Sequence, residues 1–316
     1  MSVKMRLFVL VLLASLAMAS VGDRSPDFKN CVTNCIRHTC QTQKHVPPLL
    51  HRLLLWDCPQ ECDYRCQQII TFARINQGQE IVQFHGKWPF LRFFGIQELA
   101  SVIFSMANFV PHYQGRQMLK RLNQRKPNSL IPYYIGFAMV GMNSWIWSSV
   151  FHTRDFPVTE KLDYFSAGLS VLYGFFFATV RIFRLDKESR ETPRLILASV
   201  CVTLFLAHVS YLSFIKFDYG YNMMANVVVG ALQLIMWSVY SFSQFAKTRE
   251  WWSLMPFGLC VTISAAMGLE LFDFPPWKFM VDAHSLWHAA TVIPCFLWYT
   301  WMQKDLRYEG RTDKQE

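Results

Sequence analysis

A chain of 316 residues is long enough for one or two soluble domains. Its 52% hydrophobic residues, 27 Phe and 11 Trp indicate a membrane protein instead. The net charge of +9 does not indicate a nucleic-acid partner, because the basic residues gather in alternate loops between apolar segments.

The N-terminus has the pattern of a secretory signal peptide. Lys4 and Arg6 precede the apolar run LFVLVLLASLAMA, and Ala17-Met18-Ala19 supplies small residues at the usual cleavage spacing. We therefore expect residues 1–19 to be a signal peptide cleaved near Ala19 to Gly22. An uncleaved anchor is the alternative, which the shortness of the apolar run disfavours. A cleaved signal places the next segment in the lumen or outside the cell.

Residues 20–92 form a predicted lumenal cysteine-rich region. The cysteines follow the order C-x3-C-x4-C, a long gap and C-x3-C-x3-C, at Cys31, Cys35, Cys40, Cys58, Cys62 and Cys66. An even number of cysteines in an oxidising compartment predicts three disulfides, with the connectivity left open. A zinc finger is the alternative, but it needs reduced thiolates. The other cysteines lie inside predicted helices and are interpreted as packing residues: Cys201, Cys260 and Cys295.

Seven apolar stretches follow, each close to the roughly 20 residues that a helix needs to cross hydrocarbon. They lie near 93–111, 131–151, 162–183, 194–214, 221–242, 252–271 and 282–302. The predicted fold is therefore an all-α membrane protein: a seven-transmembrane-helix bundle over 93–302 with a small N-terminal disulfide-rich region. Residues 303–316 form a predicted cytosolic tail.

The loops between these segments alternate in charge. Basic residues are dense after the first, third, fifth and seventh segments, at Arg116, Lys120, Arg121, Arg125, Lys126, Arg181, Arg184, Lys187, Arg190, Arg194, Lys247, Arg249, Lys304, Arg307, Arg311 and Lys314. The opposite loops carry only Arg154, Lys161, Lys216 and Lys278. Because positive charge favours the cytosolic side, this pattern predicts a lumenal N-terminus and a cytosolic C-terminus.

Three histidines lie at the edges of the apolar segments, in SSVFHTRD and DAHSLWHAA. His284 and His288 are four residues apart, so one helical face presents both. The predicted topology places His152 and Asp163 at the same lumenal level as this pair. Ionisable groups at membrane depth are costly and usually mark a working site. We therefore predict one polar site in the lumenal leaflet.

The chemistry of this set is typical of a metal-dependent hydrolase. Three neutral imidazoles and one water form a common open zinc site, which lowers the pKa of the water to about 7. Ser148 lies four residues before His152 and shares its face, and Asp163 is placed to move a proton. Alternatively, a histidine here packs at the interface, and Ser148 bonds between helices.

Three further polar residues fall toward the lumenal halves of their segments: Glu98, His208 and Glu270. They are candidates to shape a polar cavity or contact substrate. Hydrogen bonding between helices is the equally good alternative.

The set S-x3-H at 148–152, Asp163 and H-x3-H at 284–288 resembles the signature of the CREST superfamily of membrane hydrolases. Within it the chain resembles the post-GPI-attachment lipid-remodelling (Per-one-like) family. The supporting stretches are QFHGKWPF, NSWIWSSVFHTRD, TEKLDYF, HVSYLSFIKFDYGYN, LFDFPPW and DAHSLWH.

The resemblance implies a GPI-specific phospholipase A2 that removes the unsaturated sn-2 fatty acid from GPI-anchored proteins in the Golgi or endoplasmic reticulum membrane. It implies zinc as cofactor, His152, His284 and His288 as metal ligands, and Asp163 with Ser148 beside the metal. GPI-anchored proteins and their lipid are the expected partners, and the oligomeric state is left open.

Two other functional classes remain open at this point. One is a seven-helix receptor or lipid-binding protein in which zinc is structural. The other is a transport or cargo factor for GPI-anchored proteins, with the helices as a scaffold.

Overall fold

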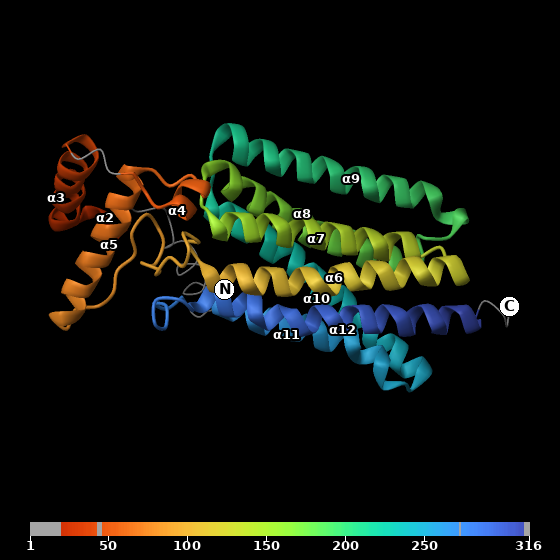
Figure 1. Cartoon of the computed structure of the whole chain (residues 1–316). Helices are drawn as coiled ribbons and strands as arrows, with labels where there is room; N and C mark the ends of the chain where they lie inside the picture. Colours follow the sequence, from red (N-terminus) through yellow and green to blue (C-terminus); the bar gives the residue numbers. More distant parts are fainter. Residues whose placement is uncertain (1–19, 43–45, 272, 313–316) are drawn as a thin grey trace, which may run out of the picture. The chain divides into compact units, whose positions relative to one another are not determined.

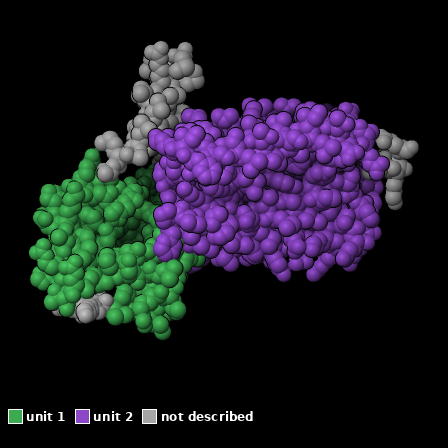
Figure 2. All heavy atoms as spheres, turned by 90° about the horizontal axis from the view of Figure 1, so that it is seen from above, with its two compact units in different colours: residues 1–102, 152–155, 272–286 green, residues 103–151, 156–271, 287–316 purple. Residues whose placement is uncertain are grey.

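The computed structural model describes residues 20–42, 46–271 and 273–312. The predicted signal peptide lies outside these residues. Within them, regular structure is helical, with isolated bridges such as Phe84 to Lys87 in place of strands. The chain divides into two compact units, coloured separately in Figure 2. Unit 1 comprises residues 1–102, 152–155 and 272–286, and unit 2 comprises 103–151, 156–271 and 287–316.

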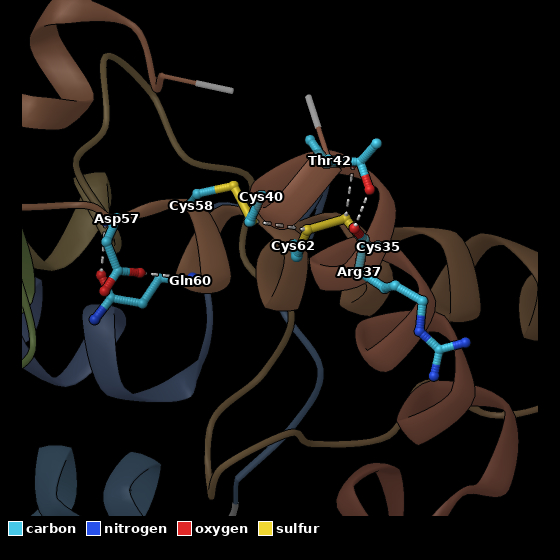
Figure 3. The surroundings of a disulfide bond; sticks show 9 residues. Cys35, Arg37, Cys40, Thr42, Asp57, Cys58, Gln60 and Cys62 are labelled. Atoms are coloured by element: carbon cyan, nitrogen blue, oxygen red, sulfur yellow. Dashed lines mark hydrogen bonds between the residues drawn. A yellow bond between two sulfur atoms is a disulfide. The ribbon is translucent and has the colours of Figure 1, made fainter. Parts of the chain in front are cut away.

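Unit 1 is built on short helices near the N-terminus. They are α2 (Val21–Arg24), α3 (Pro26–Cys35), the π-helix η1 (Ile36–Thr42), α4 (Leu49–Leu53) and α5 (Cys58–Asn76). A reciprocal cap starts α5. The backbone N–H of Gln60 donates to the side chain of Asp57, and the backbone N–H of Asp57 donates to the side-chain oxygen of Gln60 (Figure 3). The small core packs Phe28 on Phe84, with ring centroids 4.7 Å apart.

Three disulfides join the first cysteine triplet to the second, which confirms the prediction of disulfides. The pairs are nested: Cys31–Cys66, Cys35–Cys62 and Cys40–Cys58. Nested pairs are what two antiparallel helices produce when successive turns face each other. Figure 3 shows the two bonds nearest the turn between them.

The unequal cysteine spacings have a structural explanation. On α5 the cysteines recur every four residues, but Cys35 and Cys40 are five residues apart. The π-helix η1 covers this step, and a π-helix repeats at i to i+5. The wider turn therefore keeps Cys40 on the face that presents the other two cysteines.

Unit 2 is dominated by long helices joined by short connections (Figure 1). The helices, some of which begin or end in unit 1, are α6 (Leu99–Arg125), α7 (Ile131–Thr153), α8 (Pro157–Ile182), α9 (Glu191–Ser210), α10 (Tyr219–Thr248), α11 (Met255–Leu271) and α12 (Ala283–Thr312). Short elements extend two of them: η2 (Glu188–Arg190) and η3 (Tyr211–Ile215) flank α9, and η4 (Trp251–Leu254) precedes α11. Within the bundle α10 packs against α8 and α11, and α8 packs against α9.

Each of the predicted apolar segments overlaps one of these helices, but they are not equally apolar. Four helical stretches of the described chain are long and apolar enough to cross a membrane: 157–182, 188–215, 219–248 and 251–270. Helices α6 and α12 end in charged turns, and α7 carries several Ser, Tyr and Trp residues, which lower their hydropathy. The structure thus supports a helical membrane protein with four apolar spans, and seven spans remain a prediction.

The core of unit 2 is aromatic. The ring of Trp237 lies 5.2 Å from that of Trp301 and 5.4 Å from that of Phe177, which in turn lies 5.3 Å from that of Tyr134. All four side chains are almost completely buried. Tilted and edge-on contacts of this kind suit the ring quadrupole and lock α7, α8, α10 and α12 together.

A buried ionic cluster joins α8 to the last turns of α12. Arg181 donates from Nε and Nη2 to the two carboxylate oxygens of Asp305, at 2.8 and 2.6 Å, and from Nη2 to Glu309 at 2.7 Å. Tyr134 also donates to Asp305, and Arg184 donates to Glu309. Bidentate geometry compensates the desolvation of these charges, so removal of one partner leaves the others uncompensated.

We expect the joint replacement Cys35→Ser and Cys62→Ser to destabilise unit 1 by about 2–4 kcal/mol, because the unfolded chain loses a cross-link. Limited proteolysis of the purified full chain should then cut α3 and α5 faster than in the wild type. Reduction of the wild type provides the positive control. A double variant as resistant as the wild type would show that the helix contacts hold without this bond.

Replacement of Asp305 by Asn should cost about 3–5 kcal/mol of stability, because Arg181 keeps a buried charge without its bidentate partner. Thermal unfolding of the detergent-solubilised protein measures this loss. Lys304→Ala is the matched control, since Lys304 is the exposed neighbour on the same helix. Equal melting of the two variants would contradict a stabilising role for the cluster.

Candidate metal centre

His152 lies in the last turn of α7 and is held in unit 1 by a buried carboxylate. Its Nδ1 lies 2.8 Å from Oε2 of Glu98, and the two residues are only 2% and 5% exposed. Because an ionised carboxylate only accepts, the Nδ1–H of His152 donates and Nε2 keeps its lone pair. Glu98 therefore fixes the tautomer that binds metals through Nε2.

Glu98 itself is balanced by a lysine. Lys87 Nζ lies 2.7 Å from Oε1 of Glu98 and 3.0 Å from Oδ2 of Asp155. Burial lowers the pKa of Lys87, but the two carboxylates more than offset it, so the pKa is raised and the lysine stays charged. Backbone hydrogen bonds from Gln97 to Thr153 and from Glu98 to His152 also join the segment before α6 to the end of α7.

His284, in the first turn of α12, faces His152. The two Nε2 atoms are 3.3 Å apart, and the ring centroids are 5.1 Å apart. Two nitrogens that each lie about 2.0–2.1 Å from one tetrahedral zinc are about 3.3–3.4 Å from each other. The observed separation therefore fits two ligands of one zinc ion.

His288 lies one turn further along α12 and has its own buried partners in unit 2. Its Nδ1 lies 3.0 Å from Oγ of Ser105, and this hydroxyl lies 2.9 Å from Oγ of Ser148. The side-chain amide of Asn108 donates to the carbonyl of His288 at 2.7 Å. The indole of Trp145 packs edge-on against the imidazole, with centroids 5.2 Å apart.

His284 and His288 both lie on α12. Residues four apart share one face of a continuous helix, so α12 carries His288 beside His284. In both His152 and His288 a hydrogen bond engages Nδ1, which leaves Nε2 as the ligand atom. His152, His284 and His288 are thus a possible metal-binding group.

The other predicted residues lie in different surroundings. Ser148 is buried and bonds Ser105 on another helix, so the alternative of a hydrogen bond between helices is realised at this residue. Asp163 is half-buried on α8, and its catalytic role remains a prediction. His208 Nε2 lies 3.1 Å from the side-chain oxygen of Asn222, which joins α9 to α10.

Three residues that support this region were not singled out in the sequence: Lys87, Ser105 and Asn108. Ser105 and Asn108 are three positions apart in the mainly apolar first turns of α6, which is a detectable signal of one polar face. Lys87 had no comparable signal, because its carboxylate partners are 11 and 68 positions away in the sequence, at Glu98 and Asp155.

Comparisons with known proteins match nearly the whole chain. The Per1-like family model matches residues 48–306. A protein of Schizosaccharomyces pombe named Protein PER1 homolog is 44% identical over 87% of this chain and 83% of its own length. Protein PER1 of Saccharomyces cerevisiae is 38% identical over 97% of this chain and 99% of its own. A Xenopus tropicalis protein named GPI-specific phospholipase A2-like PGAP3 is 37% identical over 95% of both chains. No solved structure matches.

We expect Glu98→Gln to weaken zinc binding by about 10–100-fold, because the neutral amide no longer fixes the His152 tautomer. Competition with a chromophoric chelator measures the zinc affinity of the purified full chain. Glu80→Gln is the matched control, since Glu80 is an exposed glutamate of the same unit. Unchanged zinc affinity in Glu98→Gln would rule out this supporting role.

Proposed function

The chain belongs to the Per1-like family, and we propose that it is a zinc-dependent GPI-specific phospholipase A2. It removes the unsaturated sn-2 fatty acid from GPI-anchored proteins during fatty-acid remodelling. Relatives that align with this chain over almost their full length carry the name GPI-specific phospholipase A2-like, which supports GPI remodelling at the level of the family. The observation that carries the proposal is the pair of facing Nε2 atoms of His152 and His284, 3.3 Å apart.

In this proposal His152, His284 and His288 hold the zinc ion. When bound, zinc polarises the ester carbonyl and makes water a nucleophile near neutral pH. Glu98 donates no proton; it orients His152 and stabilises the imidazole as a ligand. Ser105 plays the corresponding part for His288, with Ser148 as the next member of that hydrogen-bonded chain.

Asp163 is the proposed proton carrier. A carboxylate near the ester takes the proton of the attacking water and returns it to the leaving alcohol of the glycerol. Ser148 would lie close to the attacking water, because it shares the face of α7 that also presents His152.

The membrane supplies the remaining requirement, which is access to the lipid. Four apolar helical spans support a membrane protein. We propose that the N-terminus is lumenal, the C-terminus cytosolic, and the membrane that of the Golgi or endoplasmic reticulum. With this topology the histidines lie at the headgroup boundary of the lumenal leaflet, where a GPI lipid exposes its sn-2 ester. We also propose the division into signal peptide, lumenal region, helical domain over 93–302 and cytosolic tail.

The test uses the purified, zinc-loaded full chain and a GPI lipid with a defined unsaturated sn-2 chain. The wild type should release that fatty acid, as followed by mass spectrometry. Asp163→Asn and His284→Ala should each reduce the rate by at least about a hundredfold, since a proton carrier contributes about 10²–10⁴. Asp27→Asn, an exposed carboxylate of unit 1, is the control and should keep the wild-type rate.

Two outcomes would favour the other functional classes. Zinc binding without release of fatty acid would favour a receptor or lipid-binding protein with structural zinc. Normal remodelling in cells that carry only Asp163→Asn would favour a cargo factor whose helices are a scaffold.

A further inference from the structure

Unit 1 contains a cavity of about 410 Å³, within the size range of small-molecule sites. Its walls come from α3, η1, α5 and the residue Trp56 before α5, from the segment 84–97 and from the residues after α7. Aromatic rings form much of the lining, among them Trp56, Tyr64 and Trp88. Of the residues described above around the histidine group, Lys87, Gln97 and Asp155 line it.

Two arginines in the lining are held rigidly by one tryptophan. The guanidinium of Arg92 lies 3.3 Å from the ring centroid of Trp56, and that of Arg154 lies 3.5 Å from it. The Trp56 indole N–H donates to the Gly95 carbonyl at 2.8 Å, which fixes the ring. Tyr64 packs against Arg92 from another side, at 4.2 Å. Groups fixed in this way lose little entropy when a ligand binds.

Most of the acidic and basic groups of the lining take part in ion pairs. Asp63 accepts from Nε2 of His85 at 2.9 Å and from the amide of Gln67 at 2.6 Å. Lys87 pairs with Asp155, and Arg92 pairs with Glu61, which is not itself a lining residue. The hydrogen bond to Asp63 raises the pKa of His85 against the opposing effect of partial burial. Because carboxylates neutralise most of these basic groups, the wall favours a polar ligand over a free anion.

The same wall offers hydrogen-bond donors and acceptors side by side, next to aromatic faces. Asp63 and the amide oxygens accept, while the arginines and the amide N–H groups of Gln60, Gln67 and Gln97 supply donors. Sugar hydroxyls each donate and accept, and the C–H faces of sugar rings are apolar enough to pack on the ring of Trp88. Carbohydrate is therefore the ligand class that satisfies all parts of this lining.

We propose that this cavity of unit 1 binds the glycan of the GPI substrate. This inference rests on the proposed function, because the cleaved lipid must carry a glycan for the cavity to contribute. Glycan binding away from the reacting ester explains how a lipid hydrolase selects GPI among lipids with the same sn-2 ester, since remote contacts contribute binding energy and specificity.

The test measures binding directly, without turnover. The probe is the soluble glycan released from a GPI-anchored protein by protease and a phosphatidylinositol-specific phospholipase C. The partner is the purified full chain with its disulfides intact, and calorimetry or ligand-observed NMR reports the affinity. Asp63→Asn and Gln67→Ala should each weaken binding about tenfold, the effect of about one hydrogen bond. Arg65→Ala, on the exposed side of α5, should bind like the wild type.

Each outcome decides the proposal. Weaker binding in both cavity variants, with wild-type binding in Arg65→Ala, supports it. Absence of glycan binding, or equal binding in all variants, overturns it. Inositol phosphate that binds as tightly as the whole glycan also overturns it, because the cavity would then recognise phosphate.

The test of the glycan site is independent of the test of fatty-acid release. A chain that binds the glycan through Asp63 but releases no fatty acid keeps the glycan site and loses the hydrolase. A chain that releases fatty acid while the cavity variants bind normally keeps the hydrolase and loses the glycan site. Intact disulfides and an unchanged melting temperature in Asp63→Asn show that the loss is not a loss of fold.

Discussion

The hydrogen bond between Glu98 and His152 is the interaction on which the candidate site depends. A buried carboxylate is tolerated only when charged or hydrogen-bonded partners compensate its desolvation, and here Lys87 and the imidazole together do so. The same bond settles the tautomer of His152 and so directs Nε2 toward His284. One electrostatic requirement thereby fixes the end of α7, the start of α6 and the segment around Lys87.

A second buried ionic cluster holds the far end of α12. Arg181 binds both Asp305 and Glu309, so this one helix carries the proposed metal-ligand histidines in its first turns and paired carboxylates in its last turns. The aromatic core around Trp237 and Trp301 lies between. Helix α12 is therefore fixed by charge at one end and by packing along its length, which limits how far its histidines can move. Metal sites require such supporting contacts, because small displacements of a ligand change its geometry.

The cysteine-rich part of the chain shows how local spacing and fold constrain each other. An added residue between Cys35 and Cys40 would rotate the third cysteine away in an α-helix, but a π-turn absorbs it. The resulting pair of cross-linked helices supports the segment 84–97, which lines the cavity and also carries Lys87 and Glu98. Stability from disulfides is useful in a unit with so small an apolar core.

The sequence by itself determined the features that depend on local pattern. Apolar length located the long helices but not all of their ends, because α6 continues to Arg125 and α12 to Thr312 in charged turns beyond the predicted ends at 111 and 302. Cysteine number predicted the disulfides, and the four-residue spacing placed His284 and His288 on one face. The tertiary structure decided what depends on contacts between distant residues. These are the nested order of the disulfides, the partnership of Lys87 with Glu98 and Asp155, and the link from His288 through Ser105 to Ser148. Helical period is written into neighbouring residues, whereas a buried hydrogen bond is chosen by desolvation among all groups that the fold brings within reach.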